Sequence, residues 1–205
     1  MARPLRAEGR AVLVVGATGS GKTYWTAEQV KGAARLLVWD CLGEWARRYR
    51  CRPVSSLLEL GRLVSAEIHG EAAPARLAVQ CLVTRENFQT FCQIAWVWLR
   101  YAPGALVVEE LADVTSPGKA PPAWGEIVRK GRHQAASVYA LTQRPAESDK
   151  TIVGNAAAIH CGMMAFPDDR AYMARCLDVG IDQVTGLKPR AWIERDMRTR
   201  ALRKG

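Results

Sequence analysis

The sequence has no apolar stretch that approaches the roughly 20 residues needed to span a bilayer. The longest candidate, residues 91–99, is short and contains Gln93. The start of the chain, residues 1–6, is basic, but no adequate hydrophobic core follows it, so we expect no secretory signal peptide. These absences argue against a membrane-spanning protein and against a secreted one.

The sequence also lacks the cysteine and histidine spacing of a zinc site. No two cysteines form a C-x-x-C motif, and the three histidines are scattered, without a metal-ligand pair. The six cysteines are Cys41, Cys51, Cys81, Cys92, Cys161 and Cys176. Most stand among apolar neighbours, which favours buried free thiols in a reducing compartment over disulfides or zinc ligands.

Internal repeats and low-complexity linkers are missing from the sequence as well. A chain of 205 residues is most simply one domain, long enough to bury roughly 70% of its unfolded surface. Hydrophobic content of 49% and seven tryptophans exclude a disordered chain. We therefore expect one folded domain, with its core at residues 10–165 and a basic segment at residues 187–205.

Short apolar runs alternate with segments of helical character along the chain. This alternation indicates an α/β fold with a mostly parallel central sheet, covered by helices on both faces. The predicted strands are residues 11–15, 35–40, 75–83, 105–108, 137–142 and 157–163, with an edge strand at 190–194. The predicted helices are residues 24–34, 55–64, 84–101 (with Thr84 as N-cap), 121–133, 149–155 and 167–177, and residues 113–122 are predicted to form an exposed loop.

Residues 16–23 match G-x-x-x-x-G-K-[ST], directly after an apolar run and before a predicted helix. The glycines let the backbone curl until successive N–H groups point at an anion, and the helix N-terminus adds partial positive charge. Lys22 is expected to reach the β- and γ-phosphates of ATP, and the Thr23 hydroxyl to ligate Mg²⁺. The predicted phosphate loop consists of Gly16, Ala17, Thr18, Gly19, Ser20, Gly21, Lys22 and Thr23.

Two adjacent acids, Glu109 and Glu110, follow the apolar run 105–108. Nucleotide hydrolysis needs one acid near Mg²⁺ and one that orients or deprotonates the attacking water. A parallel strand delivers both at its carboxyl end, where ligands of open α/β sheets bind. We assign Glu109 to Mg²⁺, through a water, and Glu110 to the attacking water. Without the phosphate loop, two solvated glutamates would be the simpler interpretation.

A third element joins a basic helix to the predicted strand 137–142 and to Gln143. We expect this strand beside the one that carries Glu109, where the Gln143 amide accepts from water and donates to the γ-phosphate. Arg129 and Arg132 are joint candidates for an arginine finger that reaches the nucleotide of a neighbouring subunit, worth roughly 10³–10⁵ in rate. A basic helix face is the alternative for each arginine, and the sequence does not choose between the two.

The phosphate loop, the strand with the two acids, R-K-G-R-H at residues 129–133 and T-Q-R-P at 142–145 together resemble the FtsK–HerA superfamily of DNA-pumping ATPases. Within it, the compact size resembles the genome-packaging ATPases of membrane-containing icosahedral DNA viruses, the group of the PRD1 packaging ATPase. The resemblance covers about residues 11–165. It implies a three-layer RecA-like P-loop NTPase core, a ring that is often a hexamer, ATP hydrolysis and translocation of double-stranded DNA.

The net charge of the chain indicates possible partners less specifically than the motifs do. Twenty-nine Lys and Arg against twenty Asp and Glu give a net charge of +9, and part of this excess lies in residues 187–205. Such a segment suits a polyanion or an acidic partner, with DNA, capsid vertex proteins or the virion membrane as candidates, and equally suits a solvated, frayed terminus. A pump that ignores DNA sequence grips phosphates, so Lys119, Lys130 and His133 are the candidate DNA contacts.

Two other functions stay open at this point. A small P-loop kinase would need an arginine-rich lid and an acceptor pocket, and neither is clear in the sequence. A morphogenesis NTPase of the filamentous-phage type would drive extrusion through a membrane, and the missing transmembrane segment counts against it. A viral packaging motor implies the host cytoplasm and the packaging vertex of the virion as its locations.

Overall fold

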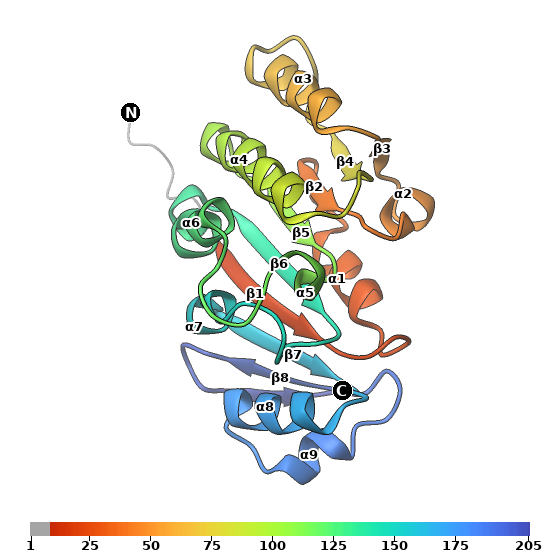
Figure 1. Cartoon of the computed structure of the whole chain (residues 1–205), viewed down its shortest axis with the longest axis vertical. Helices are drawn as coiled ribbons and strands as arrows, with labels where there is room; N and C mark the ends of the chain where they lie inside the picture. Colours follow the sequence, from red (N-terminus) through yellow and green to blue (C-terminus); the bar gives the residue numbers. More distant parts are fainter. Residues whose placement is uncertain (1–8) are drawn as a thin grey trace.

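A sheet of nine strands runs through the computed structural model, which describes residues 9–205 (Figure 1). The strand order is β3-β4-β2-β5-β6-β1-β7-β8-β9; β1 to β7 pair in parallel, and β8 and β9 join antiparallel. The strands are β1 (Arg10–Val15), β2 (Leu36–Trp39), β3 (Arg52–Val54), β4 (Arg76–Val79), β5 (Ala105–Val108), β6 (Ser137–Thr142), β7 (Ala158–Gly162), β8 (Trp192–Asp196) and β9 (Leu202–Lys204). The prediction of a mostly parallel sheet is confirmed.

Helices cover both faces of this sheet, which gives the three layers of the predicted α/β fold. Val12 and Val14 of β1 face one helical layer, whereas Leu13 and Val15 face the other. One layer consists of α1 (Lys22–Val30) and α2 (Glu44–Arg48). The other consists of α3 (Leu57–Ile68), α4 (Arg85–Tyr101), α5 (Leu111–Val114), α6 (Pro122–Lys130), α7 (Thr151–Asn155), α8 (Pro167–Leu177) and α9 (Ile181–Thr185); a 3₁₀ turn, Gly131–Gln134, follows α6. Within the described residues, no helix is long and apolar enough to cross a membrane.

The longest helix, α4, begins where the sequence predicts it. The Asn87 backbone N–H donates to the Thr84 hydroxyl at 3.1 Å, so Thr84 is the N-cap. Phe88 and Trp98 of this helix are fully buried against the sheet. The helix ends before Gly104, where a Cβ atom would lie 2.6 Å from the Trp98 ring. Only glycine fits at this contact, so the end of α4 is fixed by packing.

A buried arginine connects β2 to the ends of α3 and α4. The Arg35 guanidinium pairs with Glu67 and donates to the backbone carbonyls of Trp98, Ala102 and Pro103. The Trp98 indole N–H donates to the other oxygen of Glu67 at 2.9 Å. Every strong hydrogen-bonding group in this cluster is therefore paired, as burial of a charge requires.

Several predicted boundaries differ from the structure. The helix expected at residues 24–34 ends at Val30, and the strand expected at 75–83 ends at Val79. Residues 113–122 are only partly an exposed loop, since α5 reaches Val114, and Thr115 and Ala120 are buried. The elements α2, β3, α5, α9 and β9 were not predicted. The expectation about a signal peptide concerns residues outside the described range.

The basic segment at residues 187–205 is folded. Its second part forms β8 and β9, which pair antiparallel at the end of the sheet. The predicted edge strand is therefore shifted to Trp192–Asp196, and it is not an edge because β9 lies beyond it. The frayed-terminus interpretation is wrong, since backbone pairing holds this segment against β7.

Candidate nucleotide-binding site

The phosphate loop connects β1 to α1 and has the backbone that its glycines predict. Gly19 and Gly21 have φ angles of 78° and 94°, which side-chain-bearing residues rarely adopt. A Cβ atom on Gly16 would lie 2.3 Å from the Ser20 hydroxyl, so that position also requires glycine. No side chain caps α1, and the first N–H groups of a helix have no partner within it. These donors are available to an anion, as the loop sequence predicts.

Lys22 begins α1 and lies close to the two predicted acids, Glu109 and Glu110. Burial lowers the pKa of its ammonium group, whereas the charges of Glu110, Glu109 and Glu44 raise it. The net result is a lowered pKa, and the three acids attract the half-buried ammonium group. The structure therefore brings together the loop, the lysine and both predicted glutamates.

Glu109 and Thr23, the two predicted metal ligands, are in direct contact. The Thr23 hydroxyl donates to Glu109 Oε1 at 3.1 Å. Glu109 is only 4% exposed, and its Oε2 atom is buried without a hydrogen-bond partner. Burial raises the pKa of this carboxyl to about 7, although the nearby Trp45 indole and Thr23 hydroxyl oppose the shift. An unpaired buried carboxylate oxygen beside a hydroxyl fits a hard divalent cation such as Mg²⁺.

Glu110 and Gln143 form a second connected pair. Glu110 has a left-handed backbone (φ 43°), and its Oε1 accepts from the Thr142 hydroxyl at 3.0 Å and from the Gln143 N–H at 2.9 Å. The Gln143 side-chain oxygen in turn accepts from the Thr18 hydroxyl at 2.8 Å. β5 and β6 are neighbours in the sheet, as predicted, so both side chains emerge beside the loop. The left-handed backbone and the two donors fix the Glu110 carboxylate beside the loop, which suits an acid that orients the attacking water.

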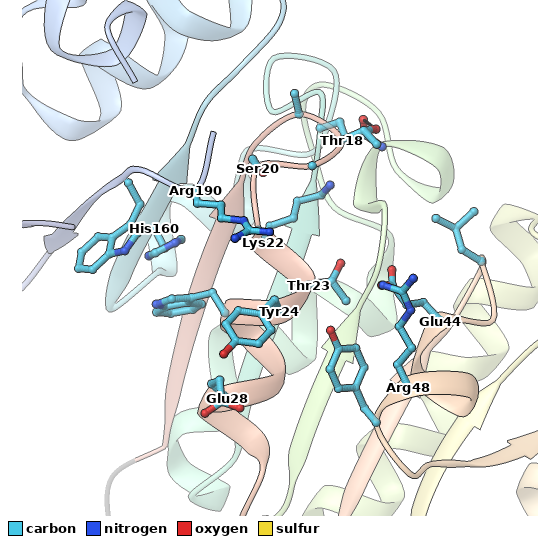
Figure 2. Close-up of a pocket in the computed structure, with 18 residues that line it drawn as sticks. Thr18, Ser20, Lys22, Thr23, Tyr24, Glu28, Glu44, Arg48, His160 and Arg190 are labelled. Carbon is cyan, nitrogen blue, oxygen red and sulfur yellow. Dashed lines mark hydrogen bonds and ion pairs between the residues drawn. The ribbon is translucent and has the colours of Figure 1, made fainter. Parts of the chain in front are cut away.

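A cleft of about 860 Å³ opens over the loop and the start of α1. Figure 2 shows Lys22 and Thr23 at its centre, with Arg190 on one side and Glu44 and Arg48 on the other. The lining residues Arg48 and Arg190 were not predicted. For Arg190 the only signal was the basic C-terminal segment, whose role the sequence left open.

The acid that ends β2 has a supporting position in this site. Asp40 is 1% exposed and accepts from the Ala46 N–H at 3.3 Å and from the Gln80 side chain at 3.2 Å. These contacts hold α2 at the cleft, where Glu44 pairs with Arg48 at 3.0 Å. Asp40 therefore orients the element that carries two of the cleft residues.

Arg129 and Arg132, the candidate finger arginines, lie near the start of β1, whereas the phosphate loop follows the end of that strand. Arg129 and Arg132 line a separate cavity of about 260 Å³, together with Gly9 and Arg10 at the start of β1. The loop follows the other end of β1, Val15. Neither arginine therefore meets the loop of its own chain, and contact with a neighbouring subunit stays a prediction.

The candidate DNA contacts are separate from the cleft. Lys119 is exposed between α5 and α6. Lys130 pairs with Glu126 at 2.9 Å, and Arg132 Nε donates to His133 Nε2 at 3.4 Å. All three side chains are exposed, and their contact with DNA stays a prediction.

Comparisons with known proteins identify relatives of this chain and proteins that share its fold. Protein P9 of Pseudoalteromonas phage PM2 is 40% identical over 179 residues, which cover 86% of this chain and 78% of that protein. The solved genome-packaging NTPase B204 of Sulfolobus turreted icosahedral virus 2, in complex with AMPPCP, aligns with a TM-score of 0.75 and 18% identity over 96% of each chain. VirB4 of Thermoanaerobacter pseudethanolicus aligns with a TM-score of 0.66 and 10% identity, over 90% of this chain and 86% of that one. No protein-family model matches the chain.

The likeness to phage PM2 protein P9 is strong enough, in identity and in coverage, to show common ancestry. The likeness to the solved ATPases shows the fold, and it confirms the resemblance and the RecA-like architecture inferred from the motifs. The chain therefore belongs to the family of protein P9 of Pseudoalteromonas phage PM2 and has the fold of the FtsK–HerA-type P-loop ATPases.

Proposed function

We propose that this chain is an ATPase that moves double-stranded DNA, and that its task is to package a viral genome into a preformed capsid. One observation carries the proposal. Residues that follow three neighbouring strands meet at one loop: Lys22 and Thr23 after β1, Glu109 and Glu110 after β5, and Gln143 after β6. Support for packaging comes from the phage relative and from the shared fold with a viral packaging NTPase.

Each of these residues has a defined task in hydrolysis. The loop N–H groups and Lys22 hold the phosphates of ATP, and Thr23 and Glu109 hold Mg²⁺. When bound, Mg²⁺ neutralises charge on the β- and γ-phosphates. Glu110 orients the attacking water and accepts its proton, and it is placed for this by the donors Thr142 and Gln143.

Gln143 connects the state of the nucleotide to the rest of the sheet. Its side chain contacts the loop residue Thr18, and its backbone N–H contacts Glu110. A γ-phosphate next to the loop offers an acceptor to the side-chain NH₂ group of Gln143, whose oxygen already accepts from Thr18. A change at this residue therefore reaches both the phosphate loop and the acid that acts on water.

Coupling to DNA requires a ring in which subunits meet at the nucleotide. Arg129 and Arg132 lie near the start of β1, at the opposite end of the strand from the cleft. In the proposed ring, a hexamer by family resemblance, subunits pack head to tail and these arginines face the nucleotide of the next subunit. Lys119, Lys130 and His133 are proposed to contact DNA phosphates. Capsid vertex proteins or the virion membrane are the proposed docking partners, at the packaging vertex or in the host cytoplasm.

The testing experiment measures ATP hydrolysis by the purified protein with and without double-stranded DNA, together with its mass in solution. We expect a ring whose hydrolysis rate rises when DNA is added. DNA binding should weaken with salt, with a log–log slope near −0.9 for each phosphate neutralised. The proposal fails if the protein is a monomer that phosphorylates a metabolite, or if only a protein partner, and not DNA, activates it.

A further inference from the structure

The topology fixes the direction in which a nucleotide lies in the cleft. Glu109 and Glu110 follow β5, Gln143 follows β6, and the loop follows β1, in the sheet order β5-β6-β1-β7-β8. The γ-phosphate end therefore lies on the β5 and β6 side. With the γ-phosphate in that position, the nucleoside extends the other way, across β1 toward β7 and β8, where His160, Arg190 and Trp192 line the cleft.

Arg190 stands at that end of the cleft. It has a left-handed backbone (φ 69°) just before β8, and its exposed guanidinium has no hydrogen-bond or ion-pair partner in the part of the chain that the structure describes. Figure 2 shows this side chain extended from the β8 side toward the start of α1. A planar cation without a partner, in a cleft wall, is free to stack on a ligand ring.

Tyr24 faces the same part of the cleft from α1. Its side chain is 66% exposed, although it directly follows the loop in the first turn of the helix. With this exposure, the Tyr24 side chain does not pack in the hydrophobic core. Tyr24 and Arg190 both line the cleft, and Figure 2 shows both side chains beside the start of α1.

Three stacked rings line the same cleft as these two residues. Trp25 stacks on His160 with ring centroids 3.9 Å apart, and His160 packs on Trp192 at 5.1 Å. Glu194 fixes the His160 ring through a 3.3 Å contact to Nδ1. Because Trp192 begins β8, this stack anchors the start of the strand, two residues after Arg190.

We propose that Arg190 and Tyr24 hold the base of the bound nucleotide between a guanidinium and an aromatic ring. The C-terminal hairpin of β8 and β9 is then part of the nucleotide site. This inference rests on the proposed function in one respect, that a nucleoside triphosphate binds the loop. Base–aromatic stacking and cation–π contacts of this kind supply roughly tenfold in affinity for each partner.

The experiment compares two ligands by calorimetric titration of the full-length protein in the presence of Mg²⁺: ATP, and inorganic tripolyphosphate, which lacks the base and ribose. Arg190→Ala should weaken ATP binding on the order of tenfold and leave tripolyphosphate binding within about twofold. Arg190→Lys, which keeps the charge but loses the planar group, should show most of the same loss. Tyr24→Ala should match Arg190→Ala, whereas Tyr24→Phe keeps the ring and should bind ATP as the wild type does.

Lys188→Ala, on the same turn and outside the cleft, is the matched control and should bind both ligands as the wild type does. Equal losses for ATP and tripolyphosphate in Arg190→Ala would show a phosphate contact and overturn the base clamp. Unchanged ATP affinity in Arg190→Ala and Tyr24→Ala would overturn it too. A wild-type protein that binds neither ligand would instead refute the proposed function, so the two failures are distinguishable.

Discussion

The Thr18 hydroxyl donates a 2.8 Å hydrogen bond to the side-chain oxygen of Gln143. This bond joins the phosphate loop after β1 to the end of β6, and Gln143 is also bonded through its N–H to Glu110. Three positions far apart in the sequence thus form one chain of hydrogen bonds at the carboxyl edge of the sheet. A nucleotide on the loop has a direct structural route to the acid that is proposed to act on water.

We predict that Glu110→Gln binds ATP and fails to hydrolyse it. The amide keeps the shape and can still accept from Thr142, but it cannot take a proton from water, so the rate should fall roughly 10²–10⁴-fold. Binding and hydrolysis are measured on the same preparation. Glu126→Gln, a surface substitution on α6, serves as control. Hydrolysis by Glu110→Gln at the wild-type rate would refute the role of Glu110.

Thr18 and Gln143 should act as a unit. Thr18→Val removes the hydroxyl donor and Gln143→Ala removes its acceptor, and each should slow ATP hydrolysis; for Gln143→Ala we expect on the order of 10²-fold. Because the residues share one interaction, the double variant should be little slower than Gln143→Ala. Fully multiplied losses in the double variant would show that the two residues act independently.

The buried Arg35–Glu67 pair should contribute strongly to stability. Glu67→Gln leaves the guanidinium buried and without its countercharge, which should lower the free energy of unfolding by about 3 kcal/mol or more. Urea denaturation gives this value. Glu126→Gln breaks an exposed pair with Lys130 and should cost less than about 1 kcal/mol. Similar costs for the two variants would contradict the assignment.

His160 should make stability depend on pH. Burial lowers its pKa from the ordinary 6.5, and the contact with Glu194 only partly opposes this shift. Between the lowered value and 6.5, the unfolded chain binds a proton that the folded chain does not. The free energy of unfolding should therefore fall with pH below about 6.5, by about 1.4 kcal/mol for each pH unit in that window.

The control for His160 is His160→Gln, measured by urea denaturation from pH 7.5 to pH 5. The difference between wild type and variant isolates the histidine from other buried groups such as Asp149, whose raised pKa acts in the opposite direction. A wild-type curve that runs parallel to the variant curve over this range would contradict the prediction.

Sequence patterns predicted the parallel sheet and the meeting of several candidate site residues because both depend on local signals. The apolar run before Gly16 and the run before Glu109 are strands that the structure confirms and places on either side of β6. Parallel pairing then brings their carboxyl ends together, with Thr23, Glu109, Glu110 and Gln143 at one edge. Regular strand geometry was sufficient to anticipate that meeting.

Other features depend on tertiary contacts that no local pattern reveals. β3 contains Pro53, which local propensity disfavours in a strand, and it is tolerated because β3 is an edge. The left-handed Glu110 is held by donors from β6. Arg190 reaches the cleft only because β8 pairs with β7 beyond the loop. The proposed role of Arg190 could therefore be inferred only from the folded structure.

The most direct test of the account measures ATP hydrolysis at saturating ATP, Mg²⁺ and linear double-stranded DNA, for the wild type and for Lys22→Ala. We predict that the wild type hydrolyses ATP faster with DNA than without it, and that Lys22→Ala shows neither basal nor DNA-stimulated hydrolysis while remaining folded. A Lys22→Ala variant that hydrolyses ATP at the wild-type rate would contradict the account.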